Sequence, residues 1–152
     1  MAERGSIFPK ISVPSFAPPG ATAEKRIYKP APFFDYSRGD FVKDGANRLT
    51  LATGREAYIQ WCLKQCVTER YTRLAYSSKI GVEIQSTIKK ETDIEAVESI
   101  IEQTITDALL VNPATEYVRD FSFAWDGSDS LGVTFQVKGK EWPEDISLTV
   151  KF

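Results

Sequence analysis

The 152-residue sequence contains no histidine, so it lacks the side chain that most often serves as a general base and as a member of hydrolase triads. It also lacks the glycine-rich GxxxxGK[ST] and GxGxxG patterns that cradle nucleotide phosphates. Carboxylate pairs such as Glu141 and Glu144 fall in predicted turns, where solvation accounts for them. We therefore expect a protein that is not an enzyme and binds no cofactor.

Cysteine is almost absent too, since the chain contains only Cys62 and Cys66. The two thiols lie four residues apart in a predicted helix and so share one face. A structural zinc site usually has four ligands, and the chain offers neither histidine nor a second cysteine pair. The sequence therefore predicts two buried, unreactive, reduced thiols and no metal site.

Neither sign of charge dominates the chain, which has 19 basic residues, 21 acidic residues and a net charge of −2. This balance provides no basic patch of the kind that binds nucleic acid or an anionic membrane. No apolar run approaches the roughly 20 residues of a membrane-spanning helix, and no signal-peptide core follows Met1. We expect a cytoplasmically made protein with neither nucleic acid nor membrane as a partner.

Proline is scarce except near the N-terminus, where residues 1–38 contain six of the eight prolines. Single apolar residues stand between them, among them Phe8, Phe16, Phe33 and Phe34. Because proline removes an amide donor and disfavours a helix, residues 1–38 should form an extended arm. We expect these phenylalanines to anchor the arm in grooves of its own domain or of neighbouring chains. A loose linker is the alternative.

Residues 39–152 are predicted to form one folded domain. The expected elements are, in order, a hairpin at 40–51, a helix from Gly54 to the charged turn Thr68-Glu69-Arg70, a strand at 71–76, a short helix or turn at 81–89, a second helix ended by Asn112-Pro113, and strands at 117–125, 131–138 and 146–152. Strands grouped after helices indicate an α+β fold, here a small antiparallel sheet with two main helices, preceded by the extended arm.

Two sequence patterns support the predicted helices. Thr53 with Glu56, and Thr92 with Glu95, have the spacing of capping boxes that satisfy free amides at a helix start. In the second helix, apolar residues repeat along one face. These residues are Ile94, Val97, Ile101, Ile105 and Leu109.

The order of these parts resembles a known family. A helix ending in Thr68-Glu69-Arg70, a Tyr-rich run, the step Gly81-Val82-Glu83-Ile84 and a second capped helix are similar to XkdS-type baseplate proteins of PBSX-like prophages. These belong to the wider gene-25-like group of baseplate wedge and sheath-initiator proteins of contractile tails. The resemblance extends from about Asp35 to Val137.

The resemblance implies a structural baseplate component of a phage tail, prophage tail or tail-like bacteriocin. Such a protein joins the wedge and hub to the sheath and initiates sheath assembly, in several copies arranged in a ring. Its expected partners are the sheath protein, baseplate wedge proteins, and tube or hub proteins. Glu69 and Arg70 would contact the wedge core. The protein would lie in the baseplate of a virion or tail particle, after assembly in the cytoplasm of a bacterial host.

The last predicted strand is the expected site of contact with the sheath. Ile146, Leu148 and Val150 alternate with polar residues, so one face should pack on the core while an outer edge stays open to a sheath strand. A closing strand covered by the protein's own helix is the structural alternative. The functional alternative is a cytosolic protein-binding adaptor of the same α+β fold, similar to an anti-adaptor. An apolar arm and an open edge favour assembly, because both are liabilities in a free monomer.

Overall fold

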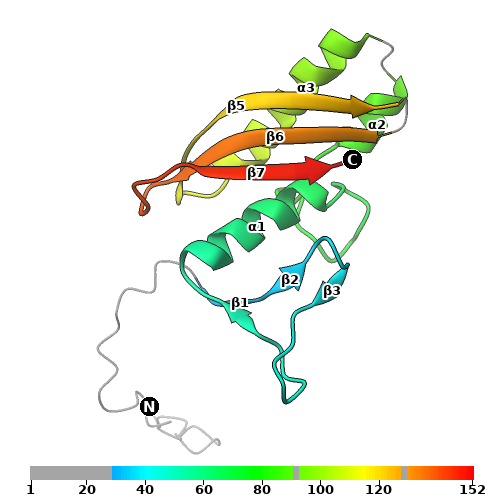
Figure 1. The fold of residues 1–152 in the computed structure, drawn as a ribbon. Coiled ribbons are helices and arrows are strands. Elements are labelled where there is room, and N and C mark those ends of the chain that lie inside the picture. Colours follow the sequence, from blue (N-terminus) through cyan, green and yellow to red (C-terminus); the bar gives the residue numbers. More distant parts are fainter. Residues whose placement is uncertain (1–28, 91–92, 128–129) are drawn as a thin grey trace, which may run out of the picture.

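A computed structural model describes residues 29–90, 93–127 and 130–152. The C-terminal part is a three-stranded antiparallel sheet in the order β5-β6-β7 (Figure 1). These strands are β5 (Thr115–Asp126), β6 (Ser130–Gly139) and β7 (Ile146–Lys151). Together with helices α1 (Arg55–Val67) and α3 (Ile94–Leu110), they confirm the predicted α+β fold.

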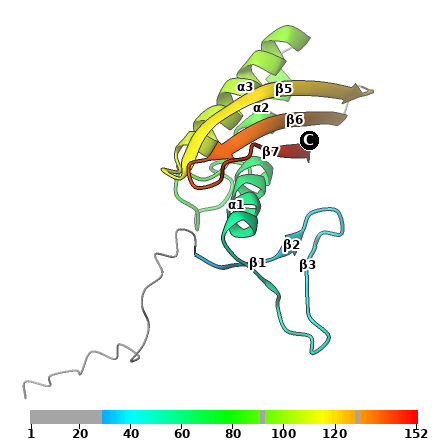
Figure 2. The same ribbon diagram turned by 60° about the vertical axis from the view of Figure 1, so that its left-hand side comes forward.

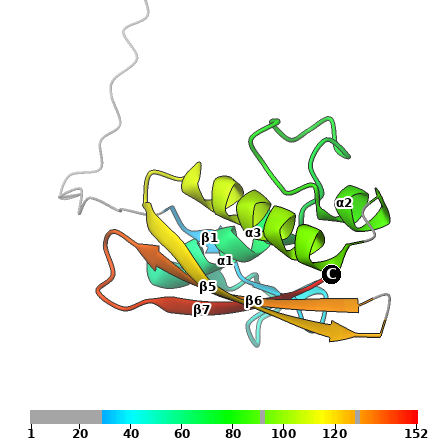
Figure 3. The ribbon, with the colours of Figure 1, turned by 90° about the horizontal axis from the view of Figure 1, so that it is seen from above.

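The sheet buries one face because apolar residues occupy every second position of its strands. In β6, the side chains of Leu131, Val133, Phe135 and Val137 are buried, and the residues between them are polar or glycine. Both long helices lie on the apolar side of the sheet, as Figure 3 shows. Among the described residues, no helix or strand covers the opposite, polar face.

Helix α3 packs its predicted apolar stripe onto the sheet. The four stripe residues after the first are buried: Val97, Ile101, Ile105 and Leu109. Ile94, the first residue of the helix, is 57% exposed. The predicted N-cap Thr92 is wrong, because Asp93 holds the N-cap position and accepts a hydrogen bond from the main-chain N–H of Glu95.

Helix α1 lies between the sheet and a group of short N-terminal strands, as Figures 1 and 2 both show. Its predicted capping box at Thr53 is also wrong. Gly54, with a φ of 55°, takes the N-cap position, so Glu56 comes one residue too early to close the box, and no side chain caps the helix. Because α1 has neighbours on several sides, its buried residues are spread around the helix. They are Ala57, Tyr58, Gln60, Cys62, Gln65 and Cys66.

Four two-residue strands precede α1. They are β1 (Ala31–Pro32), β2 (Phe34–Asp35), β3 (Asp40–Phe41) and β4 (Leu51–Ala52). The predicted turn of the 40–51 hairpin is present, since the Asp44 carboxylate accepts hydrogen bonds from the N–H groups of Ala46 and Arg48. However, β3 pairs with β2 and β4 pairs with β1, so residues 31–35 of the expected arm pair within the domain.

The strand predicted at residues 71–76 is wrong. These residues form turns and bends, and Tyr71 has a φ of 65°, which lies outside the β region. The short helix expected nearby is present as α2 (Ile84–Lys90). No helix in the described ranges combines the length and hydropathy needed to cross a membrane.

Candidate functional site

The strand β7 lies at one edge of the sheet, and its main-chain groups point in two directions. Leu131 and Phe152 exchange two main-chain hydrogen bonds of 3.1 and 2.8 Å, which makes them a hydrogen-bonded pair. Such pairs alternate along an antiparallel ladder. By the register of β6 and β7, the main-chain groups of Ser147, Thr149 and Lys151 therefore point away from β6. Within the described ranges, nothing bonds to them.

The side chains that the sequence singled out in this strand do not form its outer surface. Ile146, Leu148 and Val150 are buried and pack in the core with the two long helices. On the other face, the Thr149 hydroxyl lies 3.0 Å from that of Thr134. A partner at this edge would consequently bind the main chain of β7, while the three apolar side chains hold the strand in place.

A groove of about 540 Å³ runs beside this open edge. It lies between the end of β7, helix α1 and the turn after β2. Leu63 and Val67, four residues apart on α1, contribute apolar surface, and Val67 is 54% exposed. The remaining lining residues are Tyr36, Ser37, Thr149, Val150 and Lys151. The edge of β7 therefore offers unpaired main-chain groups, and the apolar side chains of α1 lie beside them.

Glu69 and Arg70 lie where the chain leaves α1 and enters a long loop. Residues 68–70 and 81–82 hold the two ends of this loop together, a contact that we call the loop clamp. The Arg70 N–H donates to Val82 O, and the Val82 N–H donates to Thr68 O, each at 2.9 Å. The Arg70 guanidinium, partly buried, donates to Gly81 O from Nε at 3.1 Å and from Nη2 at 2.8 Å.

The two charged residues thus have different surroundings. Arg70 has an internal acceptor, so it holds the loop clamp closed. The carboxylate of Glu69 is partly exposed and forms no ion pair with another described residue. Of the pair, Glu69 is the side chain that remains available to a partner.

Gly81 in the clamp and Gln65 on α1 beside it were not selected from the sequence as site residues. Gly81 has a φ of 93°, and a Cβ at this position would lie 2.4 Å from Thr68 O, so only glycine fits. The buried Gln65 side chain accepts a hydrogen bond of 2.7 Å from the Gly81 N–H. In the sequence, an isolated glycine at position 81 indicated a special backbone conformation. No sequence pattern distinguished Gln65 from other glutamines in helices.

The structure describes only part of the expected arm. Phe8 and Phe16 lie outside the described residues. Phe33 and Phe34 belong to the N-terminal strand region, where the Phe33 N–H donates to Thr50 O and the Phe34 ring packs edge-on against Phe41 at 5.1 Å. Both rings are partly buried within the chain.

The polar face of the sheet carries a small ionic cluster. Asp145 accepts hydrogen bonds from the Tyr117 hydroxyl at 2.8 Å and from the Arg119 guanidinium. These bonds, that of Tyr117 first, lower the pKa of Asp145 from its ordinary value of 3.8. The cluster ties the strand β5 to the loop before β7.

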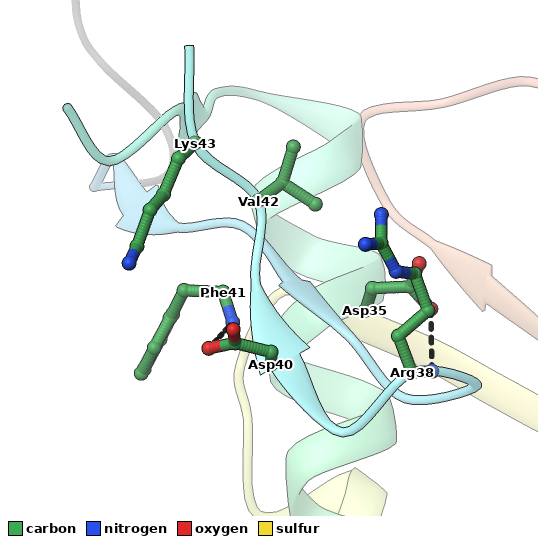
Figure 4. A pocket seen from close by; sticks show the side chains of 6 residues that line it. All are labelled: Asp35, Arg38, Asp40, Phe41, Val42 and Lys43. Atoms are coloured by element: carbon green, nitrogen blue, oxygen red, sulfur yellow. Dashed lines mark hydrogen bonds between the residues drawn. The ribbon is translucent and has the colours of Figure 1, made fainter. Parts of the chain in front are cut away.

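A second, smaller hollow lies at the turn between β2 and β3 (Figure 4). Its charged lining residues are Asp35, Arg38, Asp40 and Lys43. The Asp35 carboxylate accepts hydrogen bonds from the hydroxyl and then the N–H of Ser37, which lower its pKa. These local bonds stabilise the turn, so the hollow follows from the turn geometry.

The two cysteines are buried, as predicted. Removal from water raises the pKa of the Cys62 thiol to about 12 and raises the pKa of Cys66 as well. At neutral pH both are therefore protonated and poor nucleophiles or metal ligands. In the described part of the chain, no group of three or more potential metal ligands occurs.

Comparison with known families gives one match that spans most of the domain. The family described as contractile injection system sheath initiator matches residues 32–141. A search of curated proteins found no significant match. The matched range begins in β1 and ends after β6, so it includes α1, the loop clamp, α3 and two of the three sheet strands.

Proposed function

Because the chain belongs to the family of contractile injection system sheath initiators, and is thus a structural part of such a system, we propose that it joins the baseplate wedge and hub to the sheath and starts sheath assembly. The observation that carries this proposal is the open edge of β7. A strand of the first sheath subunit would pair with it and extend the sheet by β-strand addition.

The register determines which groups take part in this pairing. Main-chain bonds would form at Ser147, Thr149 and Lys151, whose groups point outward. Alternate side chains of the incoming strand would then face the groove beside Leu63 and Val67, and the others would face the polar side of the sheet. We expect the sheath strand to be apolar at every second position on the groove side.

The wedge would bind at the loop that follows α1. Glu69 is the candidate contact, with Arg70 keeping the loop clamp in shape beneath it. The loop itself exposes Tyr71 and Leu74, at 70% and 106% of their reference areas. An apolar loop tip next to an unpaired carboxylate suits a protein surface, because the carboxylate can orient a partner that the apolar groups bind.

The remaining assignments complete the proposal. The arm anchors Phe8 and Phe16 would attach the subunit to tube, hub or wedge proteins, and several copies would form a ring in the baseplate. Assembly would take place in a bacterial cytoplasm, and no catalytic step is involved. No described feature favours the adaptor alternative over assembly.

Thr149→Pro tests strand addition most directly. Proline removes an amide donor that points away from β6, at an edge position where a strand tolerates proline. We expect the purified variant to fold, with near-native far-UV circular dichroism, and to fail to nucleate sheaths when mixed with sheath protein and baseplates. Full-length sheaths on a folded Thr149→Pro variant would exclude strand addition at this edge.

The matched control is Thr149→Ala. This variant keeps the amide donor and loses the hydroxyl that contacts Thr134. If Thr149→Ala assembles sheaths and Thr149→Pro does not, the main chain carries the contact. If both fail equally, the side chain of Thr149 is responsible and the proposed pairing is wrong.

A further inference from the structure

An aromatic groove lies on a different side of α1 from the β7 edge. Its volume is about 590 Å³, and it lies between the start of the described chain, helix α1 and the loop whose ends the clamp joins. Five aromatic side chains line it, namely Phe34, Tyr36, Phe41, Trp61 and Tyr76. Phe41 and Tyr76 are 44% and 41% exposed, so a substantial part of this aromatic surface faces solvent.

Contacts between the walls hold the groove in shape. The Gln60 side chain accepts a hydrogen bond from the Phe34 N–H at 3.2 Å, which ties α1 to β2. The Phe34 ring packs edge-on against Tyr36, with ring centres 4.9 Å apart. On the far wall, Lys64 Nζ lies 5.1 Å from the centre of the Tyr76 ring. A preformed groove binds a segment at a lower ordering cost than a flexible surface does.

The chemistry of the groove suits an extended, proline-rich segment. Aromatic-lined grooves recognise such segments because proline rings stack on aromatic faces and the segment has already lost much of its freedom. The chain contains a matching sequence in Val13-Pro14-Ser15-Phe16-Ala17-Pro18-Pro19. It is uncharged, has three prolines and one phenylalanine, and lies outside the described residues.

The position at which the described chain begins connects this segment to the groove. Lys29 and Pro30 themselves line the groove, so the preceding chain starts at its wall. Residues 20–28 form a nine-residue connection between the segment and Lys29. Such a connection spans at most about 30 Å, which is long enough to reverse direction and enter the groove. Short tethers of this kind give effective concentrations in the millimolar range.

We propose that residues 13–19 of the free protein bind in the aromatic groove of the same chain, with Phe16 and the prolines 18 and 19 against Trp61, Phe41 and Tyr76. We expect binding within one chain, because the tether gives the segment a millimolar effective concentration. The concentration of a second copy of the protein is rarely that high. The bound segment covers aromatic surface that would otherwise promote aggregation before assembly.

This inference is independent of strand addition at β7. The groove uses the α1 face that contains Ala57, Trp61 and Lys64, whereas the β7 groove uses Leu63 and Val67. Tyr36 lines both grooves, so the tests change other residues, namely Thr149 at the β7 edge and residues of the 13–19 segment here.

A spin label on Ala17→Cys in the full chain measures the contact. The native thiols are buried and do not compete for the label. Fluorotryptophan provides three ¹⁹F signals, and Trp61→Phe identifies that of Trp61. We expect the label to abolish most of the Trp61 signal in dilute protein. The Trp125 signal serves as the reference, since its indole N–H donates to Glu98 on α3.

Two controls separate the alternatives. In a mixture of labelled protein without fluorine and fluorinated protein without label, the Trp61 signal should persist. Loss of the signal in this mixture would show that a second copy supplies the segment and would overturn the proposal. An unchanged Trp61 signal in the directly labelled chain would also overturn it.

A matched pair of variants tests which residues bind. Replacing Phe16, Pro18 and Pro19 together by serine in the labelled chain should restore the Trp61 signal. Replacing Phe8, Pro9 and Ile11 by serine should leave it suppressed. Equal effects of the two triple variants would show that the segment has no specific place in the groove and would refute the assignment.

Discussion

The sheet with α3 and the loop clamp after α1 use different interactions to hold their shape. In the first region, apolar side chains recur at regular spacing, and Val133, Phe135 and Ile101 belong to one buried apolar cluster. In the second, the contacts are main-chain hydrogen bonds, one buried amide side chain and one guanidinium. The first region depends on the amount of apolar surface that is buried, and the second on the identity of a few residues.

This difference separates stability from function within one small domain. The core face of the sheet keeps β7 straight, and its open edge remains available because α1 packs against the face of the strand. The loop clamp is anchored in the core by Val82 alone, and its hydrogen bonds determine how Glu69 and the loop tip are presented. We expect substitutions in the core to reduce the free energy of unfolding most, and substitutions in the clamp to have intermediate effects.

Phe135→Ala should have the largest effect of the variants considered. The ring is fully buried in the middle of β6 and stacks on Phe121 at 5.4 Å. Loss of a buried phenylalanine leaves a cavity and costs about 3–5 kcal/mol in the free energy of unfolding. Urea denaturation measures this loss, and Phe123→Ala, at a partly buried position, should cost less. Equal costs would show that burial does not determine stability in this sheet.

Gly81→Ala should have the next largest effect. The position combines a φ of 93° with a main-chain oxygen 2.4 Å from the added Cβ, so the clamp has to open. Backbone strain of this type costs about 1–3 kcal/mol. Gly45→Ala is the matched control, because nothing lies within 4 Å of an added Cβ there. If the two variants unfold at the same urea concentration, the clamp does not depend on glycine.

Arg70→Gln should cost less than Gly81→Ala. It removes two hydrogen bonds to Gly81 O, and we expect a loss of about 1 kcal/mol at this partly exposed site. The comparison variant is Glu69→Gln, which should leave the unfolding midpoint nearly unchanged and weaken binding to the wedge. The sequence led us to expect that both residues contact the wedge core, and this pair of variants tests whether Arg70 matters more for folding. Equal stability of Arg70→Gln and the wild type would show that Arg70, like Glu69, matters for assembly more than for folding.

The sequence predicted the periodic region well and the clamp poorly, for physical reasons. Alternation in β7 and the stripe from Val97 to Leu109 identified elements and their buried faces, because burial on one side imposes a period. The pairing partners of the short strands were harder to predict. The strands β3 and β4 pair with residues 31–35, which the prolines had suggested to be an arm. Two-residue strands contain no measurable period, and their partners depend on tertiary contacts.

For the candidate site, the sequence selected segments, and the structure shows what the single residues in them contact. The last strand was selected for its alternation, and the structure adds that Thr149 and its outward neighbours present the open main chain. Glu69 and Arg70 were selected as a pair, although only Arg70 has an internal acceptor. Such a distinction depends on a loop of about ten residues closing on itself, and no local pattern encodes that closure.

Asp145→Asn should have the smallest effect, on the polar face of the same sheet. Hydrogen bonds from Tyr117 and Arg119 lower the pKa of Asp145 below 3.8 in the folded state. A lowered pKa means that the ionised carboxylate stabilises the fold above pH 3.8, and that this contribution disappears as the pH falls through the lowered value. The wild type should therefore be slightly more stable than Asp145→Asn at neutral pH, and the difference should shrink in acid. Urea midpoints at several pH values measure this change. Because the cluster is exposed, its effect should be small beside that of Phe135, and a difference that is constant with pH would show that the charge of Asp145 does not contribute.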